Sequence, residues 1–146
     1  MKSLPNLIQV AALAALMCCA SACSQAWRDN RRAATYADRI ENSEAVSAEE
    51  YSEMVTFYCR ALDRSLDKLK PLHDAHAAAV ASGDTAMIAK TERQLTVETE
   101  SVARDTKNVS RLGSQLFNHL GALPDTTRHR LLSYLSGIYD RYSNSK

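Results

Sequence analysis

Cysteine side chains can bind metals, act as nucleophiles, form disulfides or be modified, and the cysteines of this sequence are unevenly placed. Three of the four, Cys18, Cys19 and Cys23, lie within six positions near the start of the chain. The fourth, Cys59, has no neighbouring base in the sequence, and a buried thiol without such a base is inert. We therefore predict that Cys59 is a buried, unreactive thiol and look to the N-terminal cysteines for chemistry.

The histidines offer a second kind of site. His73 and His76 are three residues apart, so both imidazoles share one face if that stretch is helical. Zinc takes three or four protein ligands, and the stretch expected to lie opposite, residues 91–94, offers Glu92 but no histidine or cysteine. We therefore expect no metal site and no cofactor. An exported helical protein that binds a metal or small ligand through His73 and His76 stays as the alternative function.

Catalytic and nucleic-acid-binding patterns are missing from the sequence. It contains no glycine-rich phosphate loop, no Gly-x-Ser-x-Gly elbow and no zinc-protease helix, so we predict that the protein is not an enzyme. The chain has 18 basic and 17 acidic residues, and residues 1–22 hold one basic residue, Lys2, and no acidic one. The remainder is balanced at 17 and 17, without the positive excess typical of nucleic-acid binding. Nucleic acid is not an expected partner.

Residues 1–22 have the three parts of an export signal. Lys2 lies near the start, an apolar run covers 7–16, and a segment of small residues ends at Ala22. The uncharged run over 7–22 is 16 residues long, which is shorter than the roughly 20 that a transmembrane helix needs. We predict that residues 1–22 are a signal peptide and that Cys18 and Cys19 are removed with it.

The tetrapeptide Ala20-Ser21-Ala22-Cys23 resembles the lipobox of bacterial lipoprotein precursors. In that family an aliphatic residue, a small residue and Ala or Gly precede an obligatory cysteine. Three positions match, and Ala20 stands where the family most often has Leu. The resemblance implies that Cys23 carries a thioether-linked diacylglycerol and an acylated amine, which together make membrane attachment effectively permanent. Ala20-x-Ala22 also fits an ordinary secretory signal peptidase, which would leave Cys23 unmodified.

The lipoprotein resemblance also implies a location. The expected place is the bacterial cell envelope, lipid-anchored, with the protein facing the periplasm or the surface. Ser24, rather than Asp, after the cysteine resembles the sorting pattern of outer-membrane lipoproteins. We therefore expect the outer membrane to hold it.

The elements that must position these groups are predicted to be helices, which makes the fold class all-α. Four glycines and three prolines interrupt the chain, and aromatic residues make up only 6% of it. Residues 23–46 comprise the lipid-attachment site, a short linker and a short N-terminal helix over 27–42. In this helix Trp27, Arg28, Arg31 and Arg32 are the candidate contacts with the membrane interface, and a simply solvated face is the alternative.

Residues 47–146 are predicted to form a helical bundle domain. Ser47 and Glu50 have the spacing of a capping box, so a helix should begin there. Pro71 then either kinks this helix or ends it and lets another begin. The turn over 82–84 should reverse the chain and produce a long antiparallel helical hairpin. A third helix, from Asp125 to about Tyr142, should close the bundle.

The second helix of the hairpin, predicted over 85–123, has one aliphatic residue in every heptad: Ile88, Leu95, Val102, Val109, Leu116 and Leu123. The companion positions three residues later include Thr91, Glu98 and Asp105. Such a narrow stripe marks a surface for a partner helix, or the pattern shifts so that Thr99 and Thr106 face inward. We expect the shift.

These inferences predict a membrane-anchored envelope lipoprotein that acts as a protein-interaction, adaptor or structural component. Its expected partners are the membrane, through lipid on Cys23, and an unidentified envelope protein or a second copy of the chain. Neither the partner protein nor its pathway follows from the residues.

Overall fold

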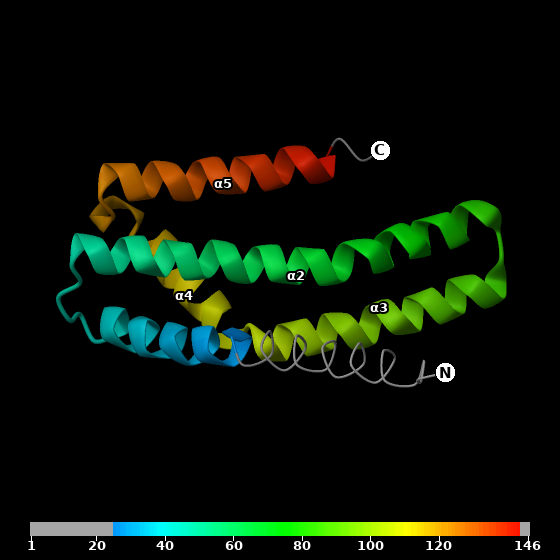
Figure 1. Cartoon of the computed structure of the whole chain (residues 1–146), viewed down its shortest axis with the longest axis horizontal. Coiled ribbons are helices and arrows are strands. Elements are labelled where there is room, and N and C mark those ends of the chain that lie inside the picture. The colour runs from blue at the N-terminus through cyan, green and yellow to red at the C-terminus, as the bar shows by residue number, and fades with distance from the viewer. Residues whose placement is uncertain (1–24, 144–146) are drawn as a thin grey trace, which may run out of the picture.

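The computed structural model describes residues 25–143, and these residues form helices joined by short connections (Figure 1). No strand occurs among them, which confirms the all-α prediction. The predicted signal peptide and Cys23 lie outside the described residues. The described part of the N-terminal helix covers residues 25–41, and a connection over 42–47 leads into α2.

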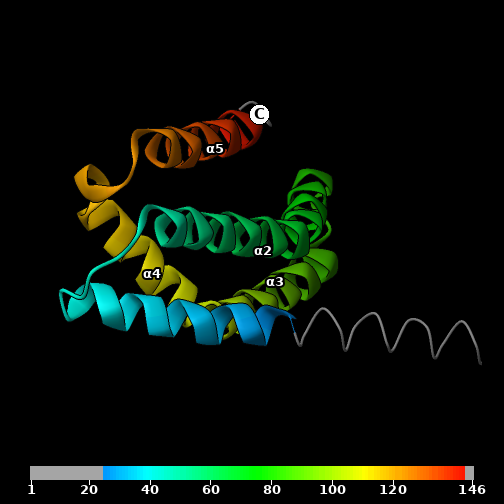
Figure 2. The same cartoon turned by 60° about the vertical axis from the view of Figure 1, so that its left-hand side comes forward.

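Helix α2, Ala48–Ser82, is the longest helix among the described residues, and its start follows from the sequence. The Ser47 side chain accepts a hydrogen bond from the Glu50 backbone N–H, and the Glu50 carboxylate accepts one from the Ser47 N–H. Pro71 lies inside the helix, which continues through it. Of the two outcomes predicted for Pro71, the helix therefore does not restart, and both views show α2 changing direction along its second half (Figures 1 and 2).

The helix predicted over 85–123 is not continuous, and this corrects the sequence prediction. It consists of α3, Thr85–Asp105, then α4, Lys107–Asn118, and a short 3-10 turn, Leu120–Ala122. Figure 2 shows α4 leaving the direction of α3 and running from beside the N-terminal helix toward the start of α5.

A side chain far away in the sequence stabilises this break. At Thr106 the backbone leaves helical geometry (φ −110°, ψ 9°), and no side chain next to it caps α4. Instead the Asn30 Oδ1 atom accepts hydrogen bonds from the backbone N–H groups of Asn108 (3.0 Å) and Val109 (3.4 Å). Asn30 thus satisfies donors at the start of α4 that a local cap residue would otherwise satisfy.

Two of the polar companion positions of α3, Thr91 and Glu98, face α2, so the predicted shift is wrong at Thr99. Farther along, Asp105 is exposed and Thr106 is half-buried. Thr91 is buried, and its Oγ1 lies 3.0 Å from Nδ1 of His76 on α2. Glu98 is half-buried and lies 3.9 Å from Nζ of Lys68. Thr99 is exposed. Thr91 and Glu98 can occupy this seam because α2 supplies a polar partner for each of them.

Helix α5, Asp125–Ser143, lies along α2 on the side opposite to α3 (Figure 1). Arg130 donates a 2.7 Å hydrogen bond to the Ser52 carbonyl, and the Tyr134 hydroxyl donates one of 2.9 Å to the Cys59 carbonyl. The residue that comes later on α5 contacts the residue that comes later on α2, so the two helices run parallel. This direction follows from two reversals of the chain, at the turn over 82–84 and at the connection over 119–124.

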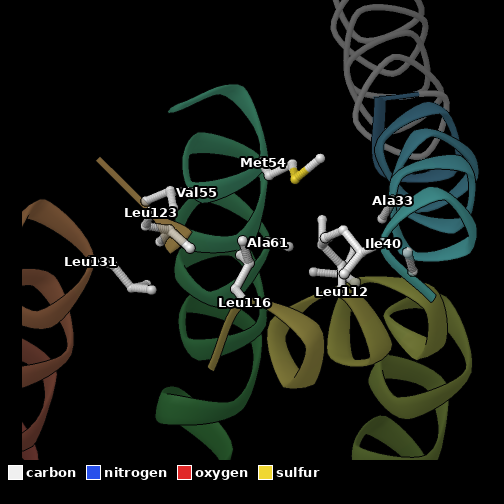
Figure 3. Packing of buried hydrophobic residues seen from close by; sticks show 11 residues of the cluster. Ala33, Ile40, Met54, Val55, Ala61, Leu112, Leu116, Leu123 and Leu131 are labelled. Atoms are coloured by element: carbon white, nitrogen blue, oxygen red, sulfur yellow. The ribbon is translucent and has the colours of Figure 1, made fainter. Parts of the chain in front are cut away.

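The hydrophobic core lies where four helices meet (Figure 3). Side chains from the N-terminal helix, the first half of α2, α4 and α5 fill it: Ala33, Ala37, Ile40, Met54, Val55, Ala61, Leu112, Leu116 and Leu131, with Leu123 beyond α4. Gly113 lets α4 approach α2 closely, because a Cβ atom there would lie 2.3 Å from the ring of Tyr58. We call the N-terminal helix, the first half of α2, α4 and α5 together the bundle.

The second half of α2 and α3, residues 66–105, extend away from the bundle as a pair that we call the arm. Figure 1 shows that, of the labelled helices, only these two reach the end of the molecule at the turn over 82–84. Gly83 ends α2 with φ +71°, and Asp84 caps α3 through the Met87 N–H. In the arm only Ala79, Thr91 and Val102 are buried.

Candidate membrane-attachment site

The helix that follows Cys23 is clamped to α2 by a buried carboxylate. Asp29 is only 1% exposed. Arg60 binds it through two hydrogen bonds, of 3.1 Å and 2.9 Å, and Arg64 adds a third of 2.9 Å. Gln25, one turn earlier, donates another of 3.1 Å. A buried carboxylate is stable when it is paired and hydrogen-bonded in this way, so the start of the N-terminal helix is fixed against the middle of α2.

The candidate interface residues separate into two groups. Trp27 is 61% exposed, and the guanidinium of Arg31 lies 5.4 Å from the centre of its ring. Arg28 and Arg31 are also exposed. These three side chains therefore lie on the outside of the helix, where a membrane interface could meet them.

Arg32 lies toward α2 instead. Its guanidinium lies 5.2 Å from the ring centre of Phe57 and 3.4 Å from the Glu53 carboxylate. Tyr36, one turn later, donates a hydrogen bond to the same carboxylate. Burial, and then the bond to Glu53, raises the pKa of Tyr36 to about 12. Arg32 is thus placed to support the helix pairing as well as to meet an interface.

The other end of the N-terminal helix is held by α4. Arg111 binds the Glu41 carboxylate through two nitrogens and reaches Asp38 at 2.7 Å, and Gln115 donates a 3.1 Å hydrogen bond to Glu41. The Arg111 hydrogen bonds hold the pKa of Glu41 below its ordinary value. With the Asp29 clamp at one end and this network at the other, the helix has a fixed position on the bundle.

Sequence reasoning missed both Asp29 and Asn30. No residue near Asp29 in the sequence marks it as buried, because its partners, Arg60 and Arg64, follow it by 31 and 35 positions. One signal was present: Arg60 and Arg64 are four residues apart and follow Phe57, so two cations share one face of α2 beside an aromatic ring. Cations placed beside a core aromatic favour a buried acidic partner.

The residues considered for metal binding are not brought together. His73 is exposed, and His76 is bonded to Thr91. Among residues 25–143 there is no group of three or more His, Cys, Asp or Glu side chains that could hold a metal ion. Cys59 is half-buried, and burial raises the pKa of its thiol.

None of the described helices is long and apolar enough to cross a bilayer. Comparison of the chain with protein-family models, with curated proteins and with solved structures finds no match.

Proposed function

We propose that this protein is an envelope lipoprotein, anchored through lipid on Cys23, whose helical bundle works through protein contacts as an adaptor or structural component. The Asp29 clamp is the observation that carries the proposal. Asp29 follows Cys23 by only six residues, a span of at most about 20 Å. A lipid on Cys23 would therefore hold the bundle at the membrane surface with little freedom to move away.

The outer side of the N-terminal helix suits such a position. Trp27, with Arg31 stacked on it, combines an amphipathic ring with a cation, and this combination is favoured at anionic membrane interfaces. Arg28 lies beside Trp27 in the same exposed turn.

Helix α5 supports the protein-interaction part of the proposal. Leu132 is 44% exposed and Tyr139 is 71% exposed, and their spacing of seven positions places both on one face of the helix. Leu135 and Ile138 are half-buried beside them. An envelope protein or a second copy of the chain would bury this apolar strip, while the α2–α3 hairpin projects from the other end of the bundle.

Labelling with a radioactive or alkyne-modified fatty acid in a bacterial host tests the anchor, followed by mass spectrometry of the mature N-terminus. The wild-type chain should incorporate label, begin at Cys23 with an acylated amine, and sediment with membranes. Cys23→Ser should abolish label and release the protein into the soluble fraction. Cys59→Ser is the matched control, because it removes a cysteine that lies inside the fold, and it should keep the label.

A mature chain with an unmodified Cys23 would overturn the anchoring proposal. Label that disappears equally in Cys59→Ser would do the same, because attachment would then not depend on Cys23.

A further inference from the structure

The outward face of α3 carries a stripe of exposed cations. Positions 90, 93, 97, 100 and 104 follow one another at spacings of three and four, on the side opposite to Ile88, Leu95 and Val102, which face α2. Three of the five are basic, one is Glu100, and one is Val97, which is 60% exposed. The cations of this basic stripe are Lys90, Arg93 and Arg104.

These three cations are not used by the fold. All three are exposed, and none makes an ion pair or side-chain hydrogen bond within the described part of the chain. On α2, by contrast, Lys68 pairs with Glu98, and Lys70 bonds Asp74 at 2.6 Å. The outer side of α3 therefore carries a row of unpaired positive charge.

The opposite side of the arm has the opposite charge. The outward face of α2 carries Asp67, Lys70 and Asp74, all exposed, and has a net negative charge. The chain as a whole is nearly neutral, with a formal charge of +1. Exposed Glu92 and Asp105 lie on the flanks of α3, so it is the outermost face of this helix, with three cations and Glu100, that has a net positive charge. An anionic surface would attract this face more than the outer face of α2.

The anchor lies beside this arm. The N-terminal helix runs antiparallel to α2, since Arg39 pairs with Glu50 whereas Asp29 pairs with Arg64. The N-terminal end of this helix therefore points in the direction of the arm. Helix α2 continues in that direction for 18 residues beyond Arg64, about 27 Å. In both views the N-terminal helix and α3 lie on the same side of α2 (Figures 1 and 2). A membrane close to residue 25 thus lies close to α3.

We propose that the basic stripe of α3 lies on the anionic headgroups of the membrane, so that the arm rests along the surface. This inference rests on the proposed lipid anchor and extends it from a point of attachment to an oriented contact. Val97 lies at the centre of the stripe, and the Trp27–Arg31 pair extends the same contact toward the anchor. The acidic face of α2 and the apolar strip of α5 then remain accessible to proteins.

Vesicle sedimentation with the chain from residue 23 carrying Cys23→Ser tests the stripe without the lipid; this chain contains all the described helices. The probes are vesicles of phosphatidylcholine, and vesicles of phosphatidylcholine and phosphatidylglycerol in equal parts. We expect binding to the mixed vesicles only, and we expect high salt to abolish it. Each cation held near an anionic surface strengthens binding about fivefold, so Arg93→Gln with Arg104→Gln should weaken it about 25-fold.

The matched control removes two cations from α5, on the far side of α2, by Arg128→Gln with Arg141→Gln. It changes net charge equally and should bind within about twofold of the parent chain if binding depends on the stripe. Circular dichroism should show unchanged helix content in both double variants, because all four side chains lie on helix surfaces.

Several results would overturn the inference. Equal loss in both double variants would show a response to net charge alone. Equal binding to both vesicle types would exclude headgroup charge as the cause. Binding to polyglutamate without binding to mixed vesicles would point to an acidic protein partner. An unmodified Cys23 in the mature chain would instead remove the anchor, and the vesicle experiment would still report on the stripe by itself.

Discussion

The bundle and the arm use the same helical periodicity and differ in how much of it they bury. Ile88 and Leu95 in the arm are half-buried, whereas Leu116 and Leu123, from the same heptad series, are buried. The difference lies in the number of neighbouring helices. In the arm each helix has one described neighbour, whereas in the bundle α2 is packed against three others (Figure 3). Periodicity therefore identifies which face of a helix is apolar, and the number of surrounding helices determines how deeply that face is buried.

Their polar groups differ in the same way. The bundle buries a full charge, Asp29, and surrounds it with two guanidinium groups. The arm buries only the neutral hydroxyl of Thr91, which His76 satisfies. Burying a charge requires several partners at once, and only the bundle brings enough elements together to supply them.

A pair of leucine truncations tests the difference most strongly. Leu116→Ala should lower the free energy of unfolding by about 3 kcal/mol, because it opens a cavity in a closely packed core. Leu95→Ala, in the arm, should cost under about 1.5 kcal/mol, because water already reaches that side chain. Urea unfolding of both variants measures this. Equal losses would contradict the distinction between bundle and arm.

The Asp29 clamp should give the next largest effect. Asp29→Asn removes the buried charge and leaves Arg60 and Arg64 without their shared partner, so we expect a loss of about 2 to 3 kcal/mol. Asp38→Asn removes a carboxylate whose side chain is 57% exposed and should cost under about 1 kcal/mol. Thermal unfolding compares them, and a similar cost for both would show that the clamp adds no stability.

Replacing two different glycines by alanine should change the stability of the protein in opposite directions. Gly113→Ala forces a methyl group against the Tyr58 ring and should destabilise the protein by about 1 to 3 kcal/mol. Gly137 lies inside α5 with open space around its Cα, so Gly137→Ala should stabilise by about 0.5 to 1 kcal/mol. If Gly113→Ala were neutral, α4 would not depend on this close approach to α2.

Acid should lower the stability of the bundle before it affects the arm, and this effect should be smaller than those of the substitutions above. Hydrogen bonds from Arg111 and Arg39 hold the pKa values of Glu41 and Glu50 below the ordinary 4.5. The stability that these carboxylates contribute is therefore present above pH 4.5 and is lost as the pH falls through their lowered pKa values. Melting temperatures across this range should decline less steeply for Glu41→Gln.

Much of the fold was predictable because its signals are local. The capping box at Ser47, the turn at Gly83 and the heptad aliphatics each act within a few residues, and the helices begin and pack accordingly. The break at Thr106 was not predictable, since an uninterrupted aliphatic repeat runs across it and its stabilising contact comes from Asn30. Asp29 was missed for the same reason: a pairing partner 31 residues away leaves no pattern around the aspartate itself.

The residues of the candidate site show the same difference between local signals and distant contacts. Trp27 and Arg31 could be selected by residue type, and they are exposed together as the pattern indicated. Arg32 has the same chemistry, yet its side chain lies over Phe57, a position that depends on how two helices pack. Residue type therefore predicts what a side chain can contact, and tertiary packing determines which contact it makes.

The contacts of the N-terminal helix also bear on the order in which the molecule can assemble. Synthesis delivers this helix first, but its partners follow it by 31 positions at Arg60 and by 79 at Val109. Closing such long loops is slow compared with forming a hairpin such as the one at Gly83. The first of the described helices to be made is therefore expected to complete its contacts last, because Asn30 and Glu41 bind groups on α4.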